Sequence, residues 1–230
     1  NVIEYPLDDA QQFVLDDRFP CALSNDLDMI FLCTPNNPTG NAFPREQLLD
    51  ICDRFPGIVV IDEAYADFSA RGSLANEAMR RENLVVLQTL SKARAMAGLR
   101  IGMAVSSAEV IRLMSMVKYP YNLSRAAMEK ALAFLGTPID TEVSAIVKER
   151  KALSAALPAF PFVRKVFPSD ANFILVRVDD ADGLYAYLLG EGIIVRNRNR
   201  VRGCEGCLRL TVGLPEENEA LLNALKRFTV

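Results

Sequence analysis

The sequence of 230 residues contains no histidine and no tryptophan. Without histidine, the chain has no Ser-His-Asp or Cys-His catalytic arrangement and no histidine-based metal site, and we expect it to bind no metal. Its apolar runs are too short to span a bilayer. Its first residues have neither the basic start nor the apolar core of a secretory signal. We therefore expect a cytoplasmic protein without a membrane partner.

Cysteine is scarce as well, and the five residues are Cys21, Cys33, Cys52, Cys204 and Cys207. An odd number in a chain of intracellular character predicts free thiols. Cys204 and Cys207 form a single Cys-x-x-Cys pair, whereas a structural zinc site needs a second pair nearby. A zinc or redox role for this pair is thus the less favoured interpretation.

Short apolar strands and amphipathic helices alternate along the first half of the chain. We expect strands at 2–7, 27–33, 58–61, 84–90 and 100–105, and a helix at 44–55. Such alternation predicts an α/β fold, with a large domain whose mostly parallel sheet is covered by helices on both faces.

The second half begins with a long, broken helical passage, which is typical of a link between domains. Helices are expected at 107–118, 124–135 and 140–157. Strands at 162–167, 172–178, 193–195 and 208–212 then alternate with helices at 182–189 and 215–228. The sequence therefore predicts a large domain over 1–117 and a smaller α+β domain over 118–230.

Polar side chains follow the apolar strands of the first half where each strand ends. They are Asn37, Asp62, Tyr65, Ser91 and Lys92. Because the carboxyl ends of parallel strands share one edge of a sheet, these residues are expected to converge. A partly desolvated lysine there can form a Schiff base with a carbonyl compound. Each residue also has an ordinary alternative: a solvated lysine, a capping or ion-paired aspartate, a turn asparagine, a packed tyrosine.

Arginines gather near the carboxyl end of the chain, at positions 196, 198, 200, 202 and 209. In a chain of net charge −3 this cluster predicts a local anion site. Arg196 and Arg209 lie on or beside expected strands, whereas the other three lie in a loop and are expected to be solvated. Nucleic acid is the less favoured partner, since the cluster lacks interleaved aromatic residues. Arg100 is a second candidate for holding phosphate.

Four segments occur in an order and spacing that resemble a known family. They are Asn36-Asn37-Pro38-Thr39-Gly40, Asp62-Glu63-Ala64-Tyr65, Thr89-Leu90-Ser91-Lys92 with Arg100 beyond it, and Leu208-Arg209-Leu210-Thr211-Val212-Gly213. Together they resemble the pyridoxal-phosphate-dependent aminotransferases of the aspartate aminotransferase fold. Within that group, Gly192-Ile193-Ile194-Val195-Arg196 and Pro120-Tyr121-Asn122 are similar to the histidinol-phosphate aminotransferase branch.

The resemblance implies a role for each matching residue. Lys92 would form the Schiff base with pyridoxal phosphate and move the substrate's proton, and Asp62 would pair with the ring nitrogen. Asn37 and Tyr65 would donate to the ring oxygen, and Arg209, assisted by Arg196, would bind the anionic end of the substrate. The implied cofactor-binding set is Asn37, Asp62, Tyr65, Thr89, Ser91, Lys92 and Arg100, the last with Thr89 and Ser91 around the phosphate.

The resemblance also implies an activity: amino transfer from L-histidinol phosphate to 2-oxoglutarate by a homodimer, in histidine biosynthesis. A threonine-phosphate decarboxylase and an aromatic amino-acid aminotransferase share these motifs and remain alternatives. Family members carry a long segment before the first motif, so we expect an N-terminally truncated chain, which alone is inactive or a folded fragment. One local departure is Arg94-Ala95-Met96, where the branch usually has Phe or Tyr, then Gly and Leu.

Overall fold

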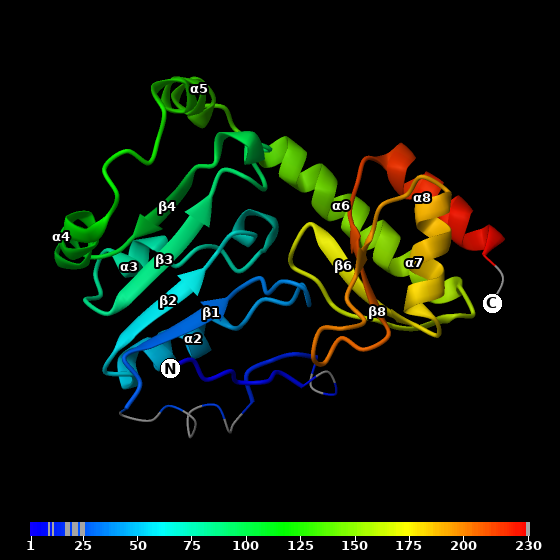
Figure 1. Cartoon of the computed structure of the whole chain (residues 1–230), viewed down its shortest axis with the longest axis horizontal. Coiled ribbons are helices and arrows are strands. Elements are labelled where there is room, and N and C mark those ends of the chain that lie inside the picture. Colours follow the sequence, from blue (N-terminus) through cyan, green and yellow to red (C-terminus); the bar gives the residue numbers. More distant parts are fainter. Residues whose placement is uncertain (9, 11, 17–18, 20–22, 24–25, 229–230) are drawn as a thin grey trace. The chain divides into compact units, whose positions relative to one another are not determined.

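The computed structural model describes residues 1–8, 10, 12–16, 19, 23 and 26–228. The chain divides into two compact units (Figure 1). Unit 1 comprises Asn1–Asp16, Asn36–Ala42 and Ser144–Val230, and unit 2 comprises Asp17–Pro35 and Phe43–Val143. The expected domains, 1–117 and 118–230, do not coincide with these units and stay a prediction.

The sheet of unit 2 has four strands in the order β1 (Met29–Cys33), β2 (Ile58–Asp62), β3 (Leu84–Thr89) and β4 (Gly102–Val105). The first three strands are parallel, and β4 is antiparallel to β3. The middle strands are β-branched and leucine-rich, and their centres are buried, as in parallel sheets covered on both faces. The predicted mostly parallel sheet is confirmed.

Unit 2 contains the helices α2 (Arg45–Arg54), α3 (Ala75–Ala78), α4 (Ala108–Val117) and α5 (Arg125–Leu135), and the short 3₁₀ helices η1 (Ala66–Phe68) and η2 (Ala97–Leu99). Serine side chains at 107 and 124 accept backbone hydrogen bonds and cap α4 and α5, as N-cap serines do. Helix α2 buries Leu48, Ile51 and Cys52. Helix α4 buries no residue and α5 buries only Ala131. Among the described residues, no helix combines the length and apolar character needed to cross a bilayer.

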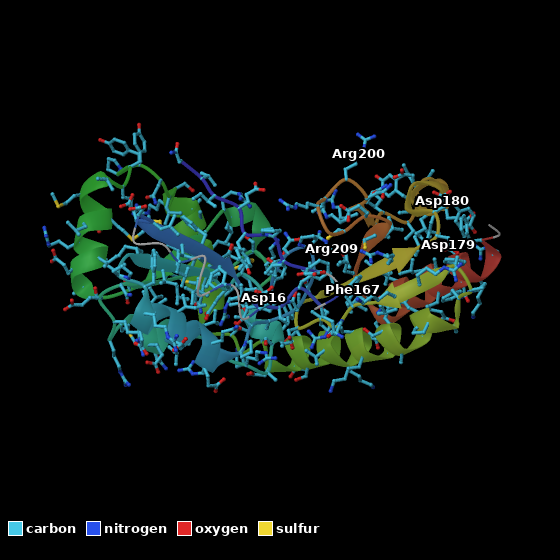
Figure 2. The ribbon with its side chains drawn as sticks, turned by 90° about the horizontal axis from the view of Figure 1, so that it is seen from below. Asp16, Phe167, Asp179, Asp180, Arg200 and Arg209 are labelled. Carbon is cyan, nitrogen blue, oxygen red and sulfur yellow. The ribbon has the colours of Figure 1, made fainter. Side chains whose placement is uncertain are left out.

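The sheet of unit 1 is antiparallel, in the order β5 (Val163–Val166), β6 (Phe173–Val178), β8 (Cys207–Thr211) and β7 (Arg196–Asn197). On one face, Phe13 from the start of the chain packs with Phe167, Leu175 and the two buried cysteines of the Cys-x-x-Cys pair. The Phe13 and Phe167 ring centroids are 5.2 Å apart, and Figure 2 marks Phe167 beside the sheet.

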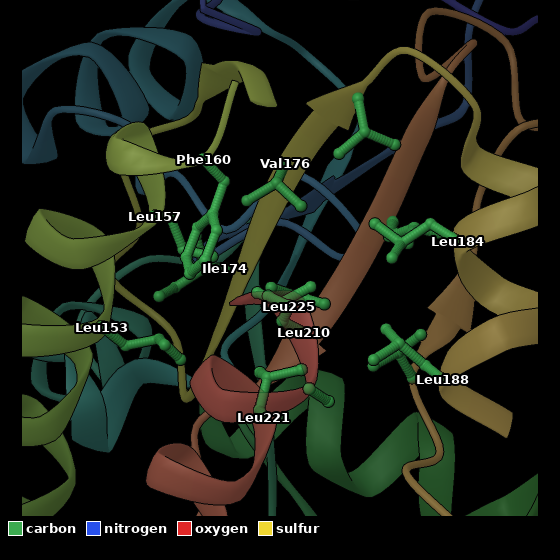
Figure 3. Close-up of a cluster of buried hydrophobic side chains, with 14 of the residues drawn as sticks. Leu153, Leu157, Phe160, Ile174, Val176, Leu184, Leu188, Leu210, Leu221 and Leu225 are labelled. Carbon is green, nitrogen blue, oxygen red and sulfur yellow. The ribbon is translucent and has the colours of Figure 1, made fainter. Parts of the chain in front are cut away.

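The opposite face of this sheet carries the larger core of unit 1 (Figure 3). It is covered by α6 (Asp140–Ala156), η3 (Leu157–Ala159), α7 (Ala181–Gly190) and α8 (Pro215–Arg227). Alternate residues of the strands, such as Ile174 and Leu208, pack against leucines from these helices, because every second side chain of a strand points to the same face of the sheet. The predicted α+β character of this part is confirmed.

Two strand predictions were wrong. Residues 2–7 form no strand, and the two sheets pair only β1 to β4 and β5 to β8 in the described part of the chain. The strand expected at 193–195 forms instead at Arg196–Asn197.

Cys52 and Cys204 are free thiols, and burial raises the pKa of each to about 11. Cys21 lies outside the described residues.

Candidate active site

Lys92 follows the carboxyl end of β3, as the sequence predicts. Its Nζ lies 4.9 Å from the centroid of the Tyr65 ring. Tyr65 lies just past the end of β2, is only 6% exposed and immediately precedes η1, so the ring is a fixed platform. An ammonium group over an aromatic face is attracted by the ring's negative face. The structure thus brings these two predicted residues together within unit 2.

Asp62 and Thr89 lie along one edge of the unit 2 sheet. Asp62 ends β2 opposite Leu87 of β3, so Thr89 lies two residues farther along the neighbouring parallel strand. Asp62 is half-buried, and its Oδ1 accepts a hydrogen bond of 2.9 Å from the Ala64 amide. Both side chains line a groove of about 670 Å³ whose walls include Leu87, Ile111 and Met114. A carboxylate in so apolar a groove favours a cationic ligand group.

The two hydroxyl residues at the end of β3 lie together. Thr89 Oγ1 is 2.9 Å from Ser91 Oγ and accepts a hydrogen bond from the Ser91 amide at 3.1 Å. Arg100 is exposed and donates to the carbonyl of Ala97 at 3.1 Å. Its φ of 56° is in the left-handed region, which is uncommon outside glycine.

Asn37 and Arg209 are in direct contact within unit 1. Arg209 Nη1 donates to Asn37 Oδ1 at 2.6 Å, and its guanidinium carbon lies 4.8 Å from the Phe173 ring centroid. A guanidinium group only donates hydrogen bonds. The amide oxygen of Asn37 therefore faces Arg209, and its NH₂ group remains to donate elsewhere.

Arg196 lies directly opposite Arg209 in the β7–β8 pair. Directly opposed residues of antiparallel strands project to the same face of the sheet, so two guanidinium groups share one side. The remaining predicted arginines belong to a braced loop: Asn197 and Asn199 donate to Asp182 at 2.6 and 2.9 Å. These bonds lower the pKa of the Asp182 carboxyl. Arg200 is exposed and projects away from the ribbon (Figure 2).

Sequence reasoning missed one buried carboxylate beside this site. Glu63 is only 4% exposed. It accepts hydrogen bonds from the hydroxyl of Ser73 at 2.5 Å, the amide of Leu74 at 2.7 Å and the side chain of Gln88 at 3.1 Å. These bonds fix the chain just beyond Asp62. The only sequence signal was its place next to Asp62 in the Asp-Glu-Ala-Tyr segment.

The predicted site residues are divided between the two units. Asp62, Tyr65, Thr89, Ser91, Lys92 and Arg100 belong to unit 2, and Asn37, Arg196 and Arg209 to unit 1. Unit 2 by itself offers a primary amine, a half-buried carboxylate, the tyrosine hydroxyl, the neighbouring hydroxyls of Thr89 and Ser91, and one guanidinium group. These match, in kind, a ligand with an aldehyde, a basic ring nitrogen, a ring oxygen and a phosphate, so the residues fit pyridoxal phosphate.

Comparisons with known proteins find relatives that share much of this sequence. A histidinol-phosphate aminotransferase from Parabacteroides distasonis is 50% identical over 200 residues, which cover 86% of this chain and 58% of that relative. One from Bacteroides fragilis is 44% identical over 233 residues, covering 99% of this chain and 67% of the relative. The chain thus spans somewhat over half to two thirds of these relatives.

Solved structures show the same fold. The histidinol-phosphate aminotransferase of Clostridium acetobutylicum matches 94% of this chain and 68% of its own, with a TM-score of 0.86 and 25% identity. A decarboxylase from Sulfurospirillum multivorans matches 96% of this chain and 68% of its own, with a TM-score of 0.87 and 26% identity. The family model "Aminotransferase class I and II" matches residues 1–225. The chain therefore belongs to the class I and II aminotransferases, a family that depends on pyridoxal phosphate.

Proposed function

We propose that the protein to which this chain belongs transfers the amino group of L-histidinol phosphate to 2-oxoglutarate, yielding imidazole-acetol phosphate and L-glutamate in histidine biosynthesis. The Arg196–Arg209 pair carries the proposal, because it offers two guanidinium groups on one sheet face. One substrate ends in a phosphate and the other in a carboxylate, and guanidinium forks match both. The names of the similar relatives support this branch of the family.

The cofactor in this proposal is pyridoxal phosphate, which supplies an electron-withdrawing ring that stabilises negative charge at the substrate's α-carbon. Asp62 would hold the protonated ring nitrogen. The ring oxygen would accept from Asn37 and Tyr65. The phosphate would be held by Thr89, Ser91 and Arg100.

Lys92 is the residue proposed to move protons. Its Nζ would bind the cofactor, then take the proton from the α-carbon of the amino donor and return it one step later. The Tyr65 ring holds Nζ from one side, which limits the positions that the amine can reach. Arg209 would hold the substrate's anionic end. Its hydrogen bond to Asn37 Oδ1 would at the same time leave the Asn37 NH₂ group free to donate to the ring oxygen.

We further propose a cytoplasmic homodimer whose partners are a small-molecule amino donor and a 2-oxo acid. A second candidate is decarboxylation of a phosphorylated amino acid, favoured by the likeness to the Sulfurospirillum multivorans decarboxylase. An aromatic amino-acid aminotransferase shares the same motifs. Product analysis separates decarboxylation from transfer: amino transfer yields glutamate without carbon dioxide, and decarboxylation yields carbon dioxide without glutamate. A panel of amino donors separates the two aminotransferases.

The test is a Lys92→Ala variant of the protein as its gene encodes it. We expect activity to fall by on the order of 10³-fold or more, because proton transfer and covalent binding lose the same amine. The visible absorbance that pyridoxal phosphate gains on binding should also disappear.

Lys130→Ala is the matched control, since Lys130 makes the same kind of contact, with Nζ 4.8 Å from the Phe134 ring centroid. Its activity should stay close to that of the unaltered protein. Full activity in Lys92→Ala would overturn the proposal. Titration of the 230-residue chain with pyridoxal phosphate shows separately whether this part alone binds the cofactor.

A further inference from the structure

The loop from Asn36 to Ala42 is held from two sides by one residue of unit 1, Asp170. The backbone amide of Asp170 donates to the carbonyl of Gly40 at 2.7 Å. Its side-chain Oδ2 accepts from the amide of Ala42 at 3.1 Å. The bond to Ala42 joins positions 128 residues apart in the sequence, so Asp170 fixes the loop end from a distant part of the chain.

The same loop packs directly on the residue before Asp170. Gly40 has a φ of +88°, and a Cβ placed there would lie only 2.7 Å from Ser169 Oγ. Ser169 is itself locked, because its hydroxyl donates to the carbonyl of Phe173 at 2.5 Å and accepts from the amide of Ala171 at 3.1 Å. The Ser169–Ala171 turn is therefore a rigid base for the loop.

A buried arginine forms a hydrogen bond with this turn. Arg150 of α6 is 8% exposed, and its Nη1 donates to the carbonyl of Ala171 at 2.7 Å. Burial lowers the pKa of Arg150, and the Asp170 carboxylate opposes that shift. The negative charge of Asp170 thus offsets part of the cost of burying the Arg150 guanidinium.

At its other end, the loop presents Asn37 to Arg209. The bond from Arg209 Nη1 to Asn37 Oδ1 is 2.6 Å long, and a charged donor makes such bonds strong and sensitive to geometry. A loop that tilts at Gly40 and Ala42 carries Asn37 with it, since only two residues separate Asn37 from Gly40. The direction of the Asn37 NH₂ group then changes as well.

We propose that Asp170 is a positioning residue: by clamping Gly40 and Ala42, it sets the direction in which the Asn37 amide donates. This inference rests on the proposed function, in which that amide donates to the ring oxygen of pyridoxal phosphate. A hydrogen bond to that oxygen stabilises its negative charge. Weakening the bond therefore raises the pKa read from the visible absorbance of the bound cofactor.

The test uses Asp170→Ala in the protein as its gene encodes it, with two readouts besides activity. Without cofactor, hydrogen exchange in a peptide spanning 36–42 should be faster by about tenfold or more, because the Ala42 amide loses its acceptor. With cofactor, the spectroscopic pKa should rise by about one unit. Asp170→Asn keeps an acceptor oxygen and should restore most of both values.

Asp180→Ala is the matched control. Asp180 also accepts a backbone hydrogen bond, from Gly183 at 2.9 Å, and caps α7 in the same unit. Its loss should lower stability while leaving loop exchange and the spectroscopic pKa unchanged. If Asp170→Ala does not fold, Asp170→Glu, which keeps the charge but moves the oxygen, should shift both readouts in the same direction.

The outcomes separate the two proposals. Unchanged loop exchange, or an unchanged spectroscopic pKa beside faster exchange, overturns the positioning role of Asp170. An unaltered protein that gains no visible absorbance with pyridoxal phosphate overturns the proposed function instead, and the exchange measurement still decides whether Asp170 holds the loop.

Discussion

Helices α8 and α4 show how differently the two units use the same sequence pattern. Both carry apolar residues at helical spacing. Helix α8 buries Leu221, Ala224 and Leu225 in the core of unit 1, whereas α4 buries no residue against the described part of the chain. Helical periodicity therefore predicts where a helix forms, but the packing that stabilises it has to be found in the structure.

The candidate site residues differ between the units in a similar way. In unit 1, Arg209 is fixed by Asn37 and by the Phe173 ring. In unit 2, Lys92 and Arg100 are exposed on the loop between β3 and β4. Unit 1 thus fixes Arg209, its proposed anion-binding residue, before any ligand arrives, whereas unit 2 presents Lys92 and Arg100, its proposed cofactor-binding residues, from a loop.

The largest expected effect compares a residue buried in the core of unit 1 with an exposed residue of α5 in unit 2. Ile174 of β6 is 0% exposed in the core of unit 1, and Leu132 of α5 is 71% exposed. Ile174→Ala should lower the free energy of unfolding by about 2–5 kcal/mol, because it leaves a cavity. Leu132→Ala should change it by less than about 0.5 kcal/mol. Urea unfolding of both variants measures this, and equal losses would mean that α5 is packed as tightly as the core.

The sequence predicts the strand-end residues of unit 2 well, because an apolar strand ends visibly where polar residues begin. Asp62 and Ser91 were located in that way. Asn37 is different: its loop follows β1 in the sequence but is held by Asp170 and Arg209, which lie far along the chain. Such long-range hydrogen bonds leave no periodic pattern. The position of Arg196 directly opposite Arg209 likewise depends on the register between β7 and β8, which the amino-acid composition does not specify.

An effect of intermediate size compares Arg209 and Arg100, the two arginines proposed to bind anionic groups. Arg209→Lys loses the planar fork and the bond to Asn37, so we expect KM for both substrates to rise about 10- to 100-fold. Arg100→Lys should weaken cofactor binding only a few-fold, because lysine still binds phosphate as a point charge. Steady-state kinetics and cofactor titration measure these changes. A larger loss in Arg100→Lys would show that the loop of unit 2 is as fixed as the sheet of unit 1.

The smallest expected effect is a change in the free energy of unfolding caused by substitutions in the loop between β3 and β4 of unit 2. Ala95 has a φ of +52° and stands where the histidinol-phosphate aminotransferase branch usually has glycine. Ala97, which lies in η2, is the control. Both alanines are exposed. Removing the Cβ at a left-handed position relieves about 1–2 kcal/mol, and glycine's extra chain entropy offsets about 0.5–1 of it. Ala95→Gly should therefore raise the free energy of unfolding by about 0.5–1 kcal/mol, and Ala97→Gly should lower it by a similar amount. Urea unfolding of the two variants gives the signs. A loss in both would mean that the loop leaves the left-handed conformation at Ala95, and that Lys92 is presented on a more mobile segment than the fixed side chains of unit 1.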